Sequence, residues 1–298
     1  MVEERHFTDR LADVLIHLSL LVLAIVCLAP FLHILALSLS SHAAISSAKV
    51  WLWPIGVHFQ NYYYMTKDQV FISSFGISVL RVLVGVTLNL LVMVLTAYPL
   101  SRDNIHMPGR QVFKVIMLIG MMFSGGLIPY YLALRNLGLL DKFWVLVVPG
   151  ALQIFSTIII INFFRGIPGE LFDAAVIDGA SHFDVLFRIF LPISLPALAT
   201  VTLFAAVGHW NAWFDGVIFI KLAKNWPLQS YLYSRITTRM LQWATGGGTG
   251  REGQALLEAT PEGLASAMIM IASIPIILVY PFLQRYFVTG LTLGSIKG

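Results

Sequence analysis

Residues 14–40 read VLIHLSLLVLAIVCLAPFLHILALSLS and contain no Asp, Glu, Lys or Arg. A helix needs about 20 apolar residues to cross the hydrocarbon core of a bilayer, and this run is longer than that. Arg5 and Arg10 precede the run, as in a signal peptide. A signal peptide, however, has an apolar core of only about 7–15 residues followed by a cleavage site, and no clear cleavage site follows here. We therefore predict a retained transmembrane helix.

Five further stretches share this charge-free, apolar character. They are residues 82–100, 115–134, 143–164, 189–214, where the span is expected to start near Pro196, and 263–284. Backbone groups inside lipid must bond to one another, and the chain lacks the ten-residue alternation of a membrane barrel. The sequence predicts an all-α polytopic membrane protein, with residues 1–298 forming one transmembrane domain of six helices. An even number of spans places both termini on the same side.

The composition excludes several other classes of protein. Hydrophobic residues make up 58% of the chain and charged residues 11%, whereas soluble domains contain about 45–50% and about 25%. A soluble or disordered chain is therefore excluded, and the net charge of +4 is too small for a nucleic-acid interface. Cys27 is the single cysteine and is expected to be a small buried apolar residue, and the histidines lack metal-ligand spacing. We predict neither a disulfide nor a metal site.

Two segments between the spans, residues 41–73 and 221–262, are long enough to fold outside the bilayer. The first contains aromatic residues typical of the lipid headgroup region, namely Trp51, Trp53, Tyr62, Tyr63 and Tyr64. The second contains a GxGxxG spacing at Gly248, Gly250 and Gly253. No strand is expected before it and the chain has no GK[ST] motif, so we interpret it as a flexible loop and predict no ATP site in this chain.

The segment between the fourth and fifth spans, residues 166–196, reads GIPGELFDAAVIDGASHFDVLFRIFLPISLP. Pro168 suits the first turn of a short helix. Four residues are spaced to share one face of that helix, namely Leu171, Ala174, Ala175 and Asp178. Gly179 follows at the position where a helix commonly ends in the left-handed conformation. The first half of the segment is therefore predicted to be a helix with a glycine turn.

The second half of the segment predicts another helix and a protein partner. Ser181 with Asp184 forms a capping-box pattern, and Leu191 and Pro192 are expected to end the helix. A helix that lies on lipid usually carries Lys and Arg on its polar face, but the polar residues here are acidic, namely Glu170, Asp173, Asp178 and Asp184. The small Ala174 and Ala175 would admit the backbone of a partner, so we predict a docking site for another protein.

These residues resemble a known motif. Asp173-Ala174-Ala175, Asp178-Gly179-Ala180, Leu191-Pro192 and Pro196 are similar to the EAA loop of membrane subunits of ATP-binding-cassette (ABC) importers. The resemblance to carbohydrate-importer permeases covers nearly the whole chain, including LAPFLHILALSLSS from residue 28, MFSGGLIPYYL from 122, GHWNAWF from 208 and YPFLQRYFVTGLTLGSIKG from 280. These stretches look most like permeases for acidic or complex oligosaccharides, including the alginate importer's second membrane subunit. Asp173 stands where the family usually has Glu.

The resemblance implies that residues 170–182 are a coupling helix seated in a cytoplasmic ATPase subunit. Its coupling residues would be Glu170, Asp173, Ala174, Ala175, Asp178, Gly179, Ala180 and His182. The C-terminal tail would also reach the ATPases, through Gly290, Gly294, Lys297 and Gly298. Both termini would then be cytoplasmic in a bacterial inner membrane. Lys and Arg are divided evenly between the two sides, so the orientation rests on this resemblance alone.

The resemblance also implies the other members of the complex. A second, related permease would complete the pore. Two ATPase subunits would bind ATP and Mg²⁺, while this chain would bind no cofactor and catalyse no reaction. Residues 41–73 and 221–262 would meet an extracytoplasmic solute-binding protein that delivers an oligosaccharide.

A candidate substrate path follows the fifth span. On a continuous helix Trp210 and Trp213 share a face beside Asn211, and flat aromatic rings with an amide suit a sugar. His209 and Asp215 flank them and complete the candidate path. The alternative is that both Trp anchor the membrane interface. Basic residues follow, namely Lys221, Lys224, Arg235, Arg239 and Arg251. They favour an acidic oligosaccharide such as an alginate or pectin fragment over a neutral sugar. The alternative is that they dock an acidic surface of the binding protein.

Two other functional classes remain as alternatives. An ion-coupled secondary transporter needs ionisable groups inside the membrane, but Arg81 and Asp215 are the only ones near the spans and are expected to snorkel from the outer ends. An intramembrane protease would need a serine and a base, for which Ser78 and His209 are candidates. No spacing in the sequence brings that pair together, so both classes are less favoured than an importer.

Overall fold

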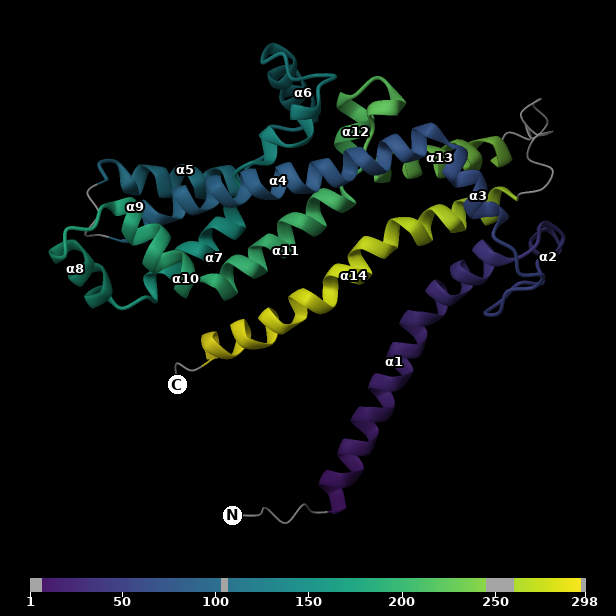
Figure 1. The fold of residues 1–298 in the computed structure, drawn as a ribbon, viewed down its shortest axis with the longest axis horizontal. Coiled ribbons are helices and arrows are strands. Elements are labelled where there is room, and N and C mark those ends of the chain that lie inside the picture. Colours follow the sequence, from purple (N-terminus) through teal and green to yellow (C-terminus); the bar gives the residue numbers. More distant parts are fainter. Residues whose placement is uncertain (1–6, 103–106, 245–259, 296–298) are drawn as a thin grey trace. The chain divides into compact units, whose positions relative to one another are not determined.

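The chain is helical wherever the structure describes it. The computed structural model describes residues 7–102, 107–244 and 260–295, and no strand occurs among them (Figure 1). The α-helices are α1 Phe7–Leu39, α2 His42–Ser46, α3 Gln60–Lys67, α4 Gln69–Ser101, α5 Arg110–Met122, α6 Leu127–Asn136, α7 Ile154–Arg165, α8 Gly169–Ile177, α9 His182–Val185, α10 Leu191–Ile193, α11 Leu195–Asn211, α12 Phe214–Phe219, α13 Leu228–Ala244 and α14 Pro261–Ser295. Short 3₁₀ turns are η1 Phe143–Leu146, η2 Val148–Gly150 and η4 Ala223–Asn225, and η3 Leu186–Phe190 is a π-helical turn. The all-α prediction is confirmed.

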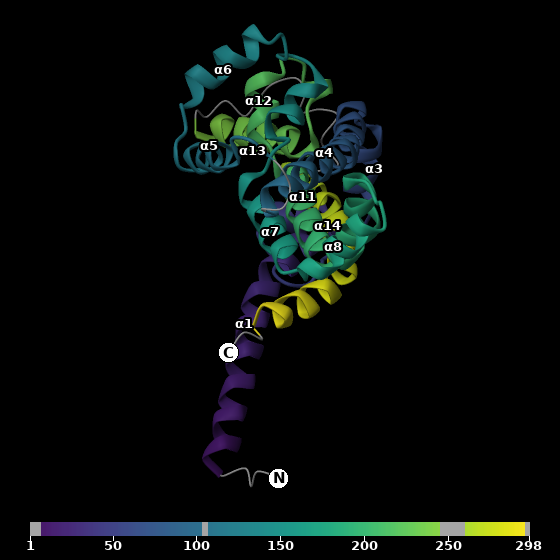
Figure 2. The same ribbon diagram turned by 90° about the vertical axis from the view of Figure 1, so that its left-hand side faces the viewer.

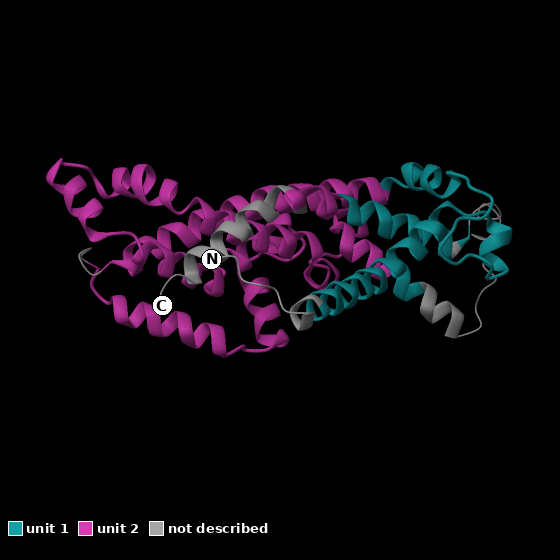
Figure 3. Cartoon of the chain, turned by 90° about the horizontal axis from the view of Figure 1, so that it is seen from below, with its two compact units in different colours: residues 1–69, 235–274 teal, residues 70–234, 275–298 magenta. Residues whose placement is uncertain are grey.

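The chain divides into two compact units, coloured separately in Figure 3. Unit 1 comprises residues 1–69 and 235–274, and unit 2 comprises residues 70–234 and 275–298. In unit 1 the buried Asn61 donates its Nδ2 to the carbonyl of Ser38 at 3.0 Å. A Cβ at Gly263 would lie 2.8 Å from that same nitrogen, so α14 approaches α3 through the glycine. Unit 2 carries the segment with the predicted partner site.

Membrane-spanning helices are present, although fewer are continuous than the sequence predicts. By length and apolarity, three stretches in the described part of the chain can cross a bilayer, namely Leu11–Leu39, Gln69–Ser101 and Glu262–Val279. Two bent helix pairs raise this number to at most five, namely Phe143–Gly150 with Ile154–Arg165, and His182–Ile193 with Leu195–Asn211. Within the second pair, α11 begins next to Pro196, as predicted.

Backbone breakers account for the differences. The predicted span 115–134 is not one helix, because α5 ends at Met122, Phe123 is extended and Gly126 adopts φ +82° before α6 begins. Pro129, in the first turn of α6, has no amide hydrogen and could not continue a helix through this point. The predicted span 143–164 also begins as 3₁₀ turns around Pro149 and then bends by 44° into α7.

The N-terminal helix is exposed along most of its apolar length. Only 6% of the most apolar 18-residue stretch of this helix is buried within this chain, and Cys27 is exposed. The expectation that Cys27 is buried is therefore wrong within this chain, because the middle of α1 is exposed. Such a surface is suited to lipid or to another subunit.

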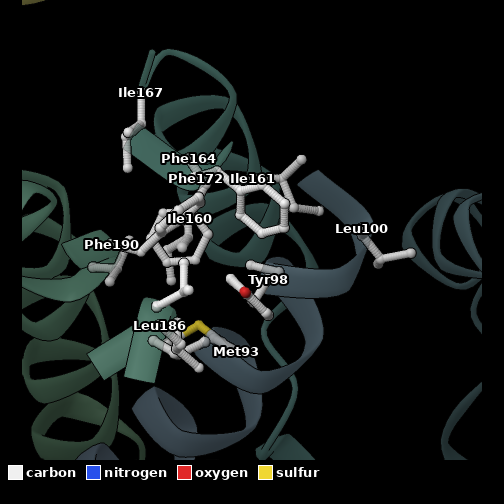
Figure 4. Packing of buried hydrophobic residues seen from close by; sticks show 14 of the residues in the cluster. Met93, Tyr98, Leu100, Ile160, Ile161, Phe164, Ile167, Phe172, Leu186 and Phe190 are labelled. Atoms are coloured by element: carbon white, nitrogen blue, oxygen red, sulfur yellow. The ribbon is translucent and has the colours of Figure 1, made fainter. Parts of the chain in front are cut away.

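An aromatic cluster in unit 2 holds the end of α4 against α7 and the segment that follows α7. Phe164 and Phe190 are fully buried and meet edge to face with centroids 5.3 Å apart. Tyr98 meets Phe190 in the same way, also at 5.3 Å (Figure 4). In Figure 1 the segment with α8 and α9 lies at this end of unit 2, and Figure 2 looks at that end directly. The cluster therefore positions the predicted partner site.

Candidate functional site

The first helix of the site ends in a well-formed glycine turn. Gly179 has φ +80°. Its amide donates to the carbonyl of Val176 at 3.1 Å, and the amide of Ala180 donates to the carbonyl of Ala175 at 2.9 Å. These two bonds form a Schellman motif, which satisfies the last carbonyl groups of a helix. The predicted helix and left-handed glycine are confirmed, although α8 begins at Gly169, one residue after Pro168.

The second helix begins with the predicted capping box. The amide of Asp184 donates to Ser181 Oγ at 3.2 Å, and the amide and hydroxyl of Ser181 donate to Asp184 Oδ2 at 3.3 Å and 2.6 Å. These bonds, together with Arg188 at 3.2 Å, hold the pKa of the Asp184 carboxyl below its ordinary value. A rigid corner therefore joins the two helices.

The second helix continues past the predicted stop at Leu191 and Pro192. The turn Leu186–Phe190 is π-helical, and α10 extends to Ile193 before Ser194 leaves the helical conformation. In a π-helical turn each amide bonds to the carbonyl five residues earlier, so the pattern of hydrogen bonds shifts by one residue. Pro192, which has no amide hydrogen, can therefore follow this turn without ending the helix. The helix therefore ends at Ile193, one residue later than predicted.

The segment presents a mixed apolar and acidic outer face. Ile177 is 85% exposed and Phe183 is 67% exposed, and Leu171 is also exposed. Glu170, Asp173, Ala174, Asp178 and His182 are exposed beside them. Ala175 and Phe172 instead point into the aromatic cluster and are buried. The prediction that Ala175 lies on the partner face is therefore wrong, and Ala180 is partly buried against the same cluster.

Helix α4 crosses unit 2 and is bonded along its length to the turns of other elements. Ser73 donates to the carbonyl of Lys224 at 2.7 Å, and Ser78 Oγ accepts from the amide of Leu228 at 2.7 Å. Asn89 donates to the carbonyl of Gly150 at 2.9 Å. Its Oδ1 lies 2.8 Å from His209 Nε2. Ser78 and His209 therefore have different partners and do not pair with each other as a protease would need.

The buried Arg81 forms an ion pair with Asp215, whose side chain is 23% exposed. The Arg81 guanidinium is bidentate to the Asp215 carboxylate and also donates to the carbonyl of Ala212 at 3.2 Å. Arg81 is 3% exposed. The expectation that both side chains snorkel outward is wrong, because each finds its counter-charge within the fold.

The residues of the predicted substrate path do not all lie on one face. Helix α11 ends at Asn211 and Ala212 is extended, so the three-residue spacing does not align the two indoles. Trp210 is 5% exposed and meets Phe75 edge to face at 5.8 Å. Trp213 is 38% exposed and stacks on Tyr233 at 3.9 Å. His209 is buried against Asn89, whereas Asn211 is exposed.

A cavity of about 590 Å³ opens elsewhere, between α5, α7 and α11. Its walls are mostly apolar, with Met121, Phe155 and Phe204 among them. The polar side chains in it are Gln153 and Ser156, and Ser156 donates to Gln153 Oε1 at 3.2 Å. It does not include the path residues that the sequence indicated.

The basic residues and the tail lie partly outside the described residues. Lys221 and Lys224 are exposed in the turn before α13. Arg235 pairs with Asp68 at 3.4 Å within unit 1. Arg251, the glycines of the GxGxxG spacing, Lys297 and Gly298 lie outside the described residues, as do the side chains of Arg239 and of the last turns of α14. Gly290 and Gly294 lie within α14.

Sequence reasoning missed two residues at the site. Tyr98 and Arg102, at the end of α4, contact both halves of the segment. Their signal was a tyrosine and an arginine spaced by one helical turn where an apolar span ends. That pattern does not predict which residues the two side chains contact, because those residues are more than 60 positions away in sequence.

Comparison with known proteins identifies the fold and family. Residues 88–292 match the model of a protein family described as the inner membrane component of binding-protein-dependent transport systems. The chain is 36% identical to the polygalacturonan/rhamnogalacturonan transport system permease protein YtcP of Bacillus subtilis, over 97% of this chain and 99% of that protein. It is 39% identical to protein LplC of the same organism, over 90% and 89%.

A solved structure agrees with these matches. A chain of a bacterial ABC transporter involved in import of the acidic polysaccharide alginate superimposes with a TM-score of 0.87 and 32% sequence identity. The match covers 95% of this chain and 98% of that chain. A chain of an alginate ABC transporter in complex with a periplasmic protein bound to an alginate pentasaccharide shares the fold, with a TM-score of 0.54 and 15% identity.

Proposed function

Because the chain belongs to the family of inner membrane components of binding-protein-dependent transport systems, we propose that it couples ATP hydrolysis to oligosaccharide import through α8 and α9. It is a non-catalytic, multi-pass permease of a sugar ABC importer in the inner membrane. The observation that carries the coupling role is the rigid corner at Gly179, with exposed apolar and acidic side chains around it. Such a surface suits a cleft in another protein.

We propose the following assembly. Residues 170–182 seat in a cytoplasmic ATPase subunit, so both termini are cytoplasmic. A second permease completes the pore, two ATPases bind ATP and Mg²⁺, and a solute-binding protein docks on the opposite side, at residues 41–73 and 221–262. Closure of the ATPases moves the coupling segments together, and rigid-body movement of the helices opens the path outward.

We propose that the cargo is an oligosaccharide of uronic acids. The names of the relatives support this, since they include a polygalacturonan transporter and an importer of an acidic polysaccharide. In this chain, Lys221 and Lys224 are exposed in the segment that follows α12, and Asn211 and Trp213 remain accessible. Positive charge at such an entrance raises the local concentration of an anion.

Competition in proteoliposomes tests the cargo. The whole importer, supplied with its binding protein, is expected to take up a labelled uronate oligomer, and an unlabelled uronate oligomer is expected to compete. A neutral oligosaccharide of equal length is the matched control and is expected to compete poorly. Equal import of both sugars would contradict the proposed preference for uronate oligomers, but the protein would still be a sugar importer.

Thiol labelling tests the orientation. In a Cys27→Ser background, cysteine at Ser181 is expected to react with a membrane-impermeant reagent only in inside-out vesicles. Cysteine at Lys49, which is exposed in the segment 41–73, is expected to react only in right-side-out vesicles. The reverse pattern for the two positions would overturn the proposed cytoplasmic location of the coupling segment.

A further inference from the structure

We propose that Arg102 is the positioning residue that ties both ends of the coupling segment to α4, an inference that rests on the proposed coupling function. Arg102 follows the last residue of α4. Its Nη2 donates to the carbonyl of Ile167 and lies 3.4 Å from that of Phe164. Its guanidinium carbon lies 5.4 Å from the centroid of the Phe190 ring.

The two contacts lie at opposite ends of the segment. The carbonyls of Phe164 and Ile167 belong to the end of α7 and to the connection that leads into α8. Phe190 closes the π-helical turn after α9, where the chain returns toward α11. One side chain on α4 therefore touches the chain where it enters the coupling segment and where it leaves.

The chemistry of these contacts is specific to arginine. Carbonyl groups at a helix end carry partial negative charge and bind a cation. The flat guanidinium can also lie over an aromatic ring, which a lysine ammonium matches less well. Gly169, the first residue of α8, lies beside the guanidinium, and a Cβ there would make an ordinary van der Waals contact with Arg102 Nη1 at 3.9 Å.

Tyr98 supplies a second contact one turn earlier on α4. Its hydroxyl shares a 3.3 Å hydrogen bond with His182 Nδ1, and its ring meets that of Phe190 edge to face. The His182 ring in turn stacks on Phe172 of α8. Arg102 therefore fixes the outer connections of the coupling segment while Tyr98 fixes its corner.

This arrangement gives α4 a mechanical role. A displacement of α8 and α9 by an ATPase would move the end of α4, which is bonded further along to the carbonyl of Gly150 and to Asp215. Movement at the ATPase would thus reach the turns beside the substrate path through one continuous helix. Without Arg102, the coupling segment would move without displacing α4, so the same ATPase movement would not reach the substrate path.

Arg102→Gln in the assembled importer tests this role. We expect amide hydrogen exchange across residues 167–181 to accelerate about tenfold, because hydrogen bonds to a charged group are lost. We also expect the number of sugar molecules imported per ATP hydrolysed to fall about tenfold. Arg165→Gln is the matched control, since it removes the same charge from an exposed side chain at the end of α7. It is expected to change neither value, and Arg102→Lys should recover part of both.

The outcomes separate this inference from the proposed function. Wild-type exchange in Arg102→Gln, or faster exchange with wild-type import per ATP, would overturn the role of Arg102. A third variant, Ile177→Glu, places a charge on the exposed face of α8 and tests ATPase docking by itself. If Ile177→Glu prevents co-purification of the ATPase while Arg102→Gln has no effect, the coupling function stands and this inference fails. If Ile177→Glu changes nothing, the coupling function itself fails.

Discussion

Gly179→Val is expected to reduce sugar uptake by the reconstituted importer to below about a tenth of the wild-type rate. Gly179 has φ +80°, and a side chain in the left-handed region costs about 1–2 kcal/mol, with β-branched residues the least tolerated. A Cβ at this position meets no atom within 4 Å, so the cost is backbone strain rather than a clash. Relief of that strain would open the Schellman turn and rotate α8 against α9.

Two controls accompany this variant. Gly179→Asn is expected to keep most of the uptake, because asparagine tolerates the left-handed conformation. Gly138→Val introduces the same kind of strain at φ +65°, also with no atom within 4 Å of the new Cβ, after α6. It is expected to leave ATPase binding intact. A stably assembled Gly179→Val complex with normal uptake would remove the case for a coupling segment at this position.

Asp215→Ala is expected to destabilise the protein by about 3–5 kcal/mol, because it leaves the buried Arg81 charge without its partner. The bidentate pair joins α4 to α12, so its loss also frees the turn after α11. The thermal unfolding midpoint of the detergent-solubilised complex measures the change, together with the fraction that remains monodisperse.

The matched control is Asp68→Ala in unit 1. Asp68 pairs with Arg235 at 3.4 Å, but the Arg235 side chain is 52% exposed. Water screens such a pair, so its loss is expected to cost less than about 1 kcal/mol. Equal destabilisation by the two variants would contradict the view that burial decides the importance of the Arg81 pair.

The sequence was sufficient for the helical class and for the local structure of the coupling segment. Gly179 and the Ser181–Asp184 capping box are local signals, because the groups that bond lie within five residues of one another. Apolar length was a weaker guide. It merged α5 and α6 into one predicted span, although Gly126 and Pro129 mark a break there, since a hydropathy count gives no weight to conformation.

The orientation of side chains could not be predicted where a helix ended early. The assumption of a continuous helix placed Trp210 and Trp213 together, but α11 ends at Asn211 and the two rings find different partners. Contacts such as Arg81 with Asp215 join residues more than 100 positions apart. Local patterns in a single sequence do not predict contacts between residues that are so far apart along the chain.

The contacts along α4 also limit how the chain can change in length. Its buried residues recur every three or four positions, as in Ser74, Ser78, Arg81, Gly85 and Asn89. Inserting or deleting one residue between Arg81 and Tyr98 would turn one part of the helix by about 100° relative to the other. Arg81 could not then contact Asp215 while Tyr98 contacts the coupling segment. Natural insertions should therefore accumulate in the outer segments and leave the residue count of α4 fixed.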